Sequence, residues 1–440
     1  MRSSTYAVLL ATLGCSCAWG DDWPQWLGPQ RDSVWREKGI VQQLPAGGLT
    51  PKWRAPIAGG YAGPAVAGGK VYVTDYQRES GDPTNGPSRR AELTGKERVH
   101  CLNADSGAVE WTYAYPCSYR VSYPAGPRAT PTVAGGKVYV LGAMGNLSCL
   151  DAQTGKPVWS VDLQAAYKTE APIWGFAGHP LVDGQKLICL VGGQNSVAVA
   201  FDKNTGKVLW TALSAGEPGY APPTIVETGG QRQLVLWHAE AVNGLDPETG
   251  NVYWSVPLAA KYGMSIATPR QLGEHLFVSG IGNAALLLKL HGDSPQADVV
   301  WGGDSRRGVY CANSTPFLEG DTIFGVCHEG ELRGIDLLTG KRLWETYAAT
   351  TGKRVAYGTA FLVKHEERFF LLNDAGDLII ARLDREGYHE QCRAHLLDPT
   401  NEAFGRPVVW SHPAFANRCV YARNDKEIIC VSLHTGDTPN

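Results

Sequence analysis

The sequence has no excess of positive charge and no long hydrophobic segment. Its 40 Lys and Arg are outnumbered by 43 Asp and Glu, which gives a formal net charge of −3. It has no basic run that could neutralise the phosphates of a nucleic acid or an anionic membrane, so neither is an expected partner. The apolar stretch from Tyr6 to Leu13 is far shorter than the ~20 residues of a transmembrane helix, so no transmembrane span is predicted.

Several catalytic and metal-binding motifs are also missing. The chain has no CxxC or CxxCH motif, which excludes a zinc ribbon and attached haem. It has neither a Gly-x-Ser-x-Gly elbow nor an HExxH motif, so a hydrolase is not indicated. His179 and His412 each stand directly before a proline, but no third ligand accompanies them, and no metal site is predicted.

The residues that are abundant favour short strands and tight turns. The 440 residues include 52 Gly, 27 Pro and 14 Trp, a combination of turn formers and large aromatics that is typical of an all-β chain. Such a domain can exceed the usual domain size of about 100–200 residues, so the length does not require a second globular domain.

The first twenty residues have the pattern of a signal peptide. Arg2 precedes the apolar stretch, and the small residues Ala18 and Gly20 precede two aspartates, which predicts cleavage after Gly20. The protein is therefore expected to be exported to the periplasm or the extracellular space. A lipoprotein attached through Cys15 is the less favoured alternative, because Thr12 stands where such signals usually carry Leu.

One motif recurs along the chain at a spacing typical of propeller blades. Leu150 to Trp159 has the pattern Leu-Asp-x-x-Thr-Gly-x-x-x-Trp, and close or weaker copies continue to the C-terminus. The turn glycines stand at positions 107, 155, 206, 250, 340, 387 and 436. A repeat of about 40–50 residues with strand-like segments predicts four-stranded blades. Asp and Gly suit the turn geometry itself, so the repeated aspartates are interpreted as structural rather than catalytic.

A second element fixes the number of blades. A short apolar run, in most copies with a proline, precedes each repeat, and eight such runs begin at Gly63, Thr130, His179, Pro222, Thr268, Thr315, Ala360 and His412. Proline is tolerated at the first residue of a strand, so each run is expected to start the innermost strand of a blade and each Trp segment to form the outermost one. The sequence therefore predicts an all-β, eight-bladed propeller of antiparallel blades over residues 49–440, after a signal peptide (1–20) and a lead-in segment (21–48).

The last blade lacks an outer strand of its own. Only four residues follow Gly436, whereas Pro51 to Pro56 form a Trp-containing strand with no blade before it. The N-terminal strand is therefore expected to complete the C-terminal blade and close the ring, which removes a free sheet edge.

These repeats, together with Trp23-Pro24-Gln25-Trp26-Leu27-Gly28-Pro29, resemble the PQQ-like repeat propellers. That family includes quinoprotein dehydrogenases and the lipoprotein propeller of the outer-membrane assembly machinery. The resemblance implies either a scaffold or a PQQ-dependent alcohol or sugar dehydrogenase, in which PQQ lies over the propeller axis with Ca²⁺, an Asp base and often a disulfide between adjacent cysteines.

The chain departs from the enzymes of that family. It has no adjacent cysteine pair, and the segments that start the innermost strands hold no cluster of Asp, Glu and Asn to supply oxygen ligands for Ca²⁺. The cofactor is therefore left unassigned, because the ligand residues do not support PQQ with Ca²⁺. The departures favour a non-catalytic binding or scaffold protein, with an unidentified protein partner or small ligand, over the dehydrogenase alternative.

The candidate ligand site is a funnel at one end of the propeller axis. The starts of the innermost strands and the hairpins after the second strands are expected to converge there. These segments carry aromatic, His, Asn and Arg side chains that suit a flat or hydroxylated ligand such as a quinone or a sugar. The candidate residues are Tyr61, Arg128, Trp174, His179, Tyr220, His238, Asn283, Asn313, Tyr357, Trp410, His412 and Arg423.

Two further features interrupt the plain repeat. Cys311 and Cys327 flank the first hairpin of the sixth blade almost symmetrically, so a disulfide between them is predicted in an oxidising compartment. The polar stretch from Gln77 to Glu97 is expected to be a long loop in the first blade, serving as a lid or partner contact or remaining disordered.

Overall fold

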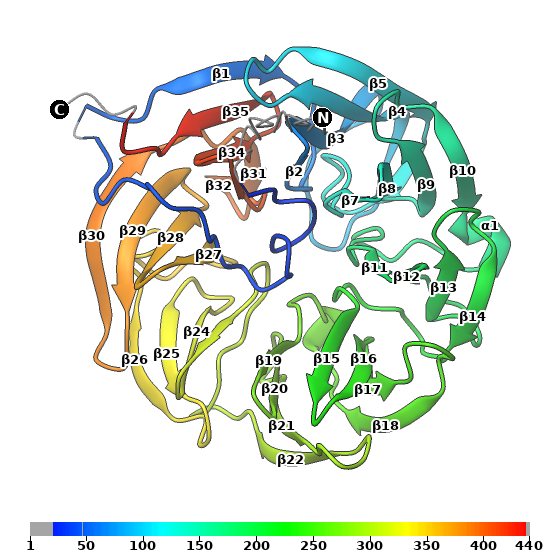
Figure 1. The fold of residues 1–440 in the computed structure, drawn as a ribbon, viewed down its shortest axis with the longest axis vertical. Helices are drawn as coiled ribbons and strands as arrows, with labels where there is room; N and C mark the ends of the chain where they lie inside the picture. Colours follow the sequence, from blue (N-terminus) through cyan, green and yellow to red (C-terminus); the bar gives the residue numbers. More distant parts are fainter. Residues whose placement is uncertain (1–20, 46, 437–440) are drawn as a thin grey trace, which may run out of the picture.

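Eight four-stranded antiparallel sheets form a closed ring in the computed structural model, which describes residues 21–45 and 47–436 (Figure 1). The predicted signal peptide lies outside the described residues. The eight-bladed propeller predicted from the repeats is confirmed. The described helices are α1 (Leu163–Tyr167) and the 3-10 turn η1 (Lys261–Gly263), and no helix in the described part is long and apolar enough to cross a membrane.

Each blade runs outward from the axis in four steps. The innermost strands are β2 (Ala65–Ala67), β7 (Thr132–Ala134), β11 (Leu181–Asp183), β15 (Thr224–Thr228), β19 (Arg270–Leu272), β23 (Phe317–Glu319), β27 (Ala360–His365) and β33 (Ala414–Ala416). The second strands are β3 (Lys70–Ser80), β8 (Lys137–Leu141), β12 (Lys186–Leu190), β16 (Gln231–Trp237), β20 (His275–Ser279), β24 (Thr322–Val326), β28 (Arg368–Asn373) and β34 (Cys419–Arg423). As predicted, the proline of a repeat directly precedes the innermost strand in seven of these blades.

The outer half of each blade carries the repeated motif. The third strands are β4 (Ala91–Asn103), β9 (Asn146–Asp151), β13 (Ala198–Asp202), β17 (Ala241–Leu245), β21 (Ala285–Leu290), β25 (Leu332–Asp336), β29 (Asp377–Leu383) and β35 (Glu427–Ser432). The outermost are β5 (Val109–Pro116), β10 (Pro157–Asp162), β14 (Val208–Ala212), β18 (Val252–Pro257), β22 (Ala297–Gly302), β26 (Arg342–Thr346), β30 (Tyr388–His395) and β1 (Pro51–Pro56).

The ring closes as predicted, through a blade built from both ends of the chain. Strand β1 pairs antiparallel with β35, and Trp53 lies opposite Cys430. The indole of Trp53 packs on Gly107 of the first blade: a Cβ at Gly107, where φ is 71°, would lie only 2.6 Å from the indole ring. The Trp53 Nε1–H donates to the carbonyl of Ala104 at 2.8 Å, so the indole joins the last blade to the first.

The same contact recurs between other neighbouring blades. Trp111, Trp159 and Trp301 pack on the turn glycines of the following blades, and their Nε1–H groups donate to carbonyls in the same turns at 2.8–3.2 Å. The repeated aspartates are hydrogen-bonded within their own turns: Asp151 Oδ1 accepts from the backbone N–H of Thr154 at 2.8 Å and from its hydroxyl at 2.7 Å. The repeated Trp residues therefore hold neighbouring blades together, and the repeated Asp residues stabilise the turns.

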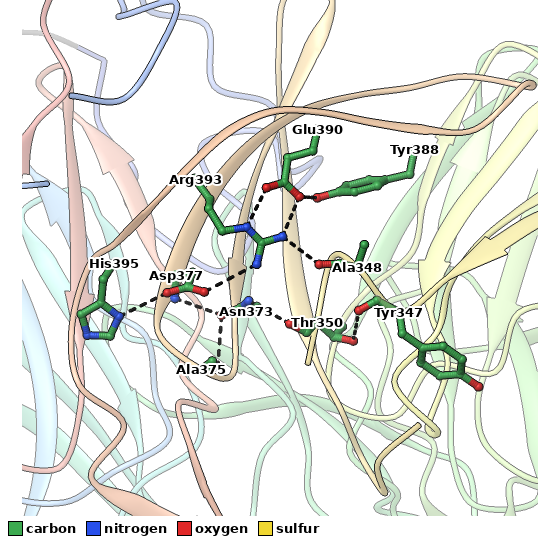
Figure 2. A network of polar contacts seen from close by, with 10 residues as sticks. All are labelled: Tyr347, Ala348, Thr350, Asn373, Ala375, Asp377, Tyr388, Glu390, Arg393 and His395. Atoms are coloured by element: carbon green, nitrogen blue, oxygen red, sulfur yellow. Dashed lines mark hydrogen bonds and ion pairs between the residues drawn. The ribbon is translucent and has the colours of Figure 1, made fainter. Parts of the chain in front are cut away.

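The seventh blade has no tryptophan in its outer strand. Cys392 occupies that position in β30, opposite Ile380, and its sulfur accepts the backbone N–H of Leu44 from the lead-in segment at 3.2 Å. Polar contacts supplement the outer face (Figure 2): Arg393 donates to Glu390 and to the carbonyl of Ala348 at 2.6 and 2.8 Å. Blade seven thus relies on polar contacts and on the lead-in where other blades use an indole.

The expectation that the stretch from Gln77 to Glu97 forms a long loop is wrong, because both of its ends belong to strands. Strand β3 continues to Ser80 and β4 begins at Ala91, so the strands take up part of this stretch and the connecting loop is confined to residues 81–90. Alternate residues at the start of β4 are buried, because Ala91 and Leu93 pack in one apolar cluster with side chains of β6 (Tyr119–Val121), which pairs with the outer edge of β4. A second small hairpin, β31 (Asn401–Ala403) and β32 (Arg406–Val408), precedes the eighth blade.

The lead-in segment occupies the axial channel. In Figure 1 its dark-blue trace crosses the centre of the ring and then runs outward over blades seven and eight. Trp23 forms a bridge with Val66 of blade one, and the backbone N–H of Trp35 donates to the carbonyl of Lys364 in blade seven at 2.8 Å. Trp23 and Trp35 are both at most 2% exposed, so the segment is part of the core.

We expect the closing contact at Trp53 to be worth several kcal/mol. Replacing Trp53 with Ala removes a buried indole and should lower the free energy of unfolding by about 3–5 kcal/mol, whereas Trp53→Phe should lose about 1 kcal/mol with the N–H donor. Val158→Ala, on the exposed side of β10, serves as the control and should change little. Guanidinium denaturation followed by circular dichroism measures each variant, and an unchanged midpoint in Trp53→Ala would contradict the assigned closure.

Candidate functional site

A cavity of about 190 Å³ lies at one end of the axial channel. The connections that lead into the innermost strands converge there, because all eight of these strands begin at the same end of the ring. The lining is mainly aromatic and aliphatic and consists of Trp26, Tyr61, Pro87, Tyr123, Arg128, Trp174, Ala177, His179, Tyr220, Met264, Ile266, Ala267, Asn313, Thr315, Tyr357, Phe361, Phe404, Trp410 and His412.

The structure brings nine of the twelve candidate residues to this pocket. They are the ones that lead into innermost strands: Tyr61, Arg128, Trp174, His179, Tyr220, Asn313, Tyr357, Trp410 and His412. Among the described residues, the hairpins after the second strands reach it only in blade one, through Pro87, because each step outward across a sheet adds about 4.8 Å of distance from the axis. The expectation that both sets of segments share one site is corrected in this respect.

The three remaining candidates have other surroundings. Arg423 is fully buried and donates to the carbonyls of Thr74 and Ala58, so it ties blade eight to blade one. His238 is buried and accepts the backbone N–H of Glu240 through Nδ1 at 3.2 Å. Asn283 is exposed in a turn, where its φ of 61° suits an asparagine.

Sequence reasoning missed several lining residues. Trp26 comes from the lead-in segment, and no feature of the sequence indicates where that segment docks. Tyr123 and Phe404 lie on connections between blades, outside the repeated motif. Their shared signal is a large aromatic residue in a segment that otherwise has the composition of a loop, which is a weak indication.

Trp26 forms the floor of the pocket together with two histidines. Its indole stacks on the His179 ring at 3.9 Å with an interplanar angle of 9°, and it meets the His412 ring edge-on at 4.8 Å. Its Nε1–H donates to Thr268 Oγ1 at 2.8 Å. The lead-in segment therefore closes the channel, and the pocket is accessible from one side.

Burial keeps both histidine rings neutral, and backbone groups orient them. His179 Nδ1 accepts the backbone N–H of Thr130 at 2.8 Å, whereas His412 Nδ1 donates to the carbonyl of Pro413 at 2.6 Å. Burial, together with the charge of Arg31, holds the pKa of His179 well below its usual range. Burial also lowers the pKa of His412 to about 4.

Arg128 is the one Lys or Arg among the described residues that line the pocket, and its guanidinium is already hydrogen-bonded. Nη1 and Nη2 donate to the carbonyls of Gly126, Ser122 and Tyr123, and the guanidinium lies 5.3 Å from the centre of the Tyr61 ring. Burial lowers the pKa of Arg128, although an arginine remains charged at neutral pH. Arg128 therefore stabilises the pocket wall, and few of its N–H groups are left to bind an anionic ligand.

Four buried polar atoms in the pocket wall have no hydrogen-bond partner among the described residues: the hydroxyls of Tyr61 and Tyr220, and the donors Asn313 Nδ2 and Trp410 Nε1. Among the described residues, no acceptor lies within hydrogen-bonding distance of Asn313 Nδ2 or Trp410 Nε1, and both atoms are buried. Buried donors are rarely left without a partner, so these two are available to a ligand. Within the described part of the chain, no Asp or Glu belongs to the lining. The pocket can therefore stack a ring and donate hydrogen bonds to it, but it offers no carboxylate base.

Cys311 and Cys327 lie opposite each other across an antiparallel bridge in blade six. Both are buried free thiols in this structure, and burial raises the pKa of Cys327 to about 12. The sulfur of Cys327 accepts the backbone N–H of Tyr310 at 3.3 Å. The disulfide stays a prediction for the oxidised protein.

Comparisons with known proteins agree with this architecture. The family model described as outer membrane protein assembly factor BamB matches residues 95–294 and 292–439. The chain is 23% identical to outer membrane protein assembly factor BamB of Shewanella oneidensis over 256 residues, which cover 55% of this chain and 63% of that protein. It is 28% identical to the quinoprotein ethanol dehydrogenase of Pseudomonas aeruginosa over 169 residues, covering 36% of this chain and 27% of that enzyme.

The fold is also similar to a solved structure. The crystal structure of BamB from Moraxella catarrhalis aligns with a TM-score of 0.54 at 15% identity, covering 81% of this chain and 99% of that one. At this identity the likeness shows the fold alone. The chain spans slightly less than two thirds of the length of the Shewanella relative.

The buried histidines predict a loss of stability in mild acid. Because the unfolded chain binds a proton near pH 6.5 and the folded His412 only near pH 4, stability is complete above pH 6.5 and falls as the pH drops toward 4. His412→Gln should reduce this loss by roughly 2–3 kcal/mol at pH 4, as measured by denaturation midpoints across the pH range. His395→Gln, on the exposed β30 strand, should not reduce it, and equal acid sensitivity in His412→Gln would contradict the assignment.

Proposed function

The chain belongs to the family of outer membrane protein assembly factor BamB, and from that membership we propose that it is an exported, non-catalytic propeller that binds a partner or small ligand through its axial pocket. The proposal places the mature propeller at residues 49–440, after a signal peptide at 1–20 and the lead-in at 21–48. Export to the periplasm agrees with the name of the BamB relatives, and attachment through Cys15 remains the alternative.

The composition of the pocket wall carries the non-catalytic part of the proposal. PQQ is a flat tricarboxylate, and quinoprotein dehydrogenases use it with Ca²⁺, which prefers several oxygen ligands including carboxylates. The residues lining the described pocket include no Asp or Glu, and the guanidinium of Arg128 already donates to three carbonyls. The residues present do not fit PQQ with Ca²⁺.

The size of the pocket supports the same conclusion. Pockets for drug-sized ligands occupy about 300–1,000 Å³, whereas this cavity measures about 190 Å³. Trp26 limits its depth, because the lead-in that carries it is anchored in the channel. A single ring fits such a space better than a fused tricyclic cofactor.

A PQQ-dependent alcohol or sugar dehydrogenase is the second candidate. It is favoured by the similarity to quinoprotein ethanol dehydrogenase and by the aromatic walls of the pocket, which suit a stacked ring. It requires a cofactor site unlike the one expected of that family, since no carboxylate belongs to the described lining.

Reconstitution with PQQ distinguishes the two candidates. Purified protein incubated with excess PQQ and Ca²⁺ should give no heat of binding, no protein-bound absorbance band and no reduction of an artificial electron acceptor by alcohols or sugars. A quinoprotein ethanol dehydrogenase treated in the same way serves as the positive control. Saturable PQQ binding together with dye reduction would establish the dehydrogenase instead.

A further inference from the structure

Three aromatic residues at the mouth of the pocket have an unfavourable backbone conformation. Tyr123, Tyr357 and Phe404 have φ values of 50°, 54° and 53°, a region in which bulky side chains are rare because their Cβ crowds the backbone. Of the four described Tyr, Phe and Trp residues with positive φ, these three line one pocket. Such strain persists where the surrounding structure requires it, and it gathers at ligand sites.

Phe404 is the clearest case in which neither the turn conformation nor burial explains the aromatic side chain. It forms the two-residue turn of the β31–β32 hairpin with Gly405, whose φ is 72°, and the flanking residues Ala403 and Arg406 pair directly. Two positive φ values in a two-residue hairpin turn favour Asn-Gly, so Phe is poorly suited to the turn itself. The side chain is also 44% exposed, so burial does not account for its presence.

The rings at the mouth contact one another. Phe404 stacks on Tyr357 at 4.7 Å with an interplanar angle of 15°, and its ring centre lies 6.2 Å from Tyr123 and 6.4 Å from Trp410. The loop at the end of the β3–β4 hairpin holds this arrangement from above, since Asn85 Nδ2 donates to Asn401 Oδ1 at 2.8 Å and to the carbonyl of Glu402 at 2.6 Å.

The polar groups around the rings indicate that the ligand is uncharged. Asn313 Nδ2 and Trp410 Nε1 are buried donors without an acceptor among the described residues, and both Nη atoms of Arg128 already donate to backbone carbonyls. The site therefore offers aromatic faces and neutral donors, which together suit an uncharged ring whose edge carries oxygen acceptors.

We propose that Tyr123, Tyr357, Phe404 and Trp410 form an aromatic clamp that holds a single uncharged ring bearing hydroxyl oxygens, with Trp410 and Asn313 as its hydrogen-bond donors. The inference rests on the proposed binding function and names the class of its ligand. A pyranose, with its apolar C–H face, and a hydroxylated aromatic ring share this chemistry, and both stack on aromatic side chains.

Phe404→Asn separates a ligand role from a structural one. Asn suits the turn, so the variant should raise the melting temperature by about 1–3 °C, while the loss of the ring should weaken ligand binding about tenfold or more. Tyr262→Asn is the matched control, because Tyr262 has a φ of 61° and is 63% exposed but does not line the pocket. It should gain stability in the same way without losing affinity.

Binding is measured by calorimetry with methyl β-glucopyranoside and with hydroquinone under anaerobic conditions. Saturable binding of either probe, weakened in Phe404→Asn and unchanged in Tyr262→Asn, supports the clamp, and the probe that binds identifies the ring as saccharide or aromatic. The clamp is overturned if neither probe binds up to its solubility limit, if Phe404→Asn binds as the unsubstituted protein does, or if Phe404→Asn is less stable. These outcomes differ from PQQ reconstitution with dye reduction, which would overturn the proposed function itself.

Discussion

At five of the eight junctions between neighbouring blades of this propeller, an indole lies on a turn glycine. The glycine has a positive φ and no side chain, so a tryptophan of the preceding blade can approach its Cα and donate a hydrogen bond to a carbonyl of the same turn. The contact combines burial of a large apolar surface with a satisfied donor. Two junctions without it have other contacts: Trp254 in the outer strand of the fourth blade donates to Gln233 of its own blade, and Cys392 of the seventh blade accepts from the lead-in segment.

This regularity explains how much of the fold could be predicted from the sequence. Turn geometry and indole packing constrain residues within one repeat, so the Asp, the Gly and the Trp leave a pattern with a fixed period. The pairing of Pro51–Pro56 with the last blade followed from the same pattern, since Trp53 stood in an unassigned outer strand. The long β3–β4 hairpin escaped prediction because its burial comes from β6, which pairs with the outer edge of β4 only after the chain has folded.

The candidate site was predictable only in part, for the same reason. Tyr61 and Trp410 stand at a known offset from an innermost strand, and that offset placed them at the axis. Trp26 and Phe404 belong to segments without a repeat, and contacts formed by distant residues position them there. The resulting pocket combines a floor anchored by the lead-in with a rim of strained rings, so one part of the site is set by packing and the other by backbone geometry.

The seam between β1 and β35 also determines when the protein can reach its native state. The outer strand of the last blade is made near the beginning of the chain and its partner near the end, so β1 has no sheet to join until almost the whole chain has emerged. Loop closure over such a separation is slow compared with local hairpin formation. The seven other blades can assemble in order during synthesis, whereas the unpaired first strand and the open sheet edge persist to the last step. The chain is therefore most exposed to aggregation and proteolysis until β35 is available to pair with β1.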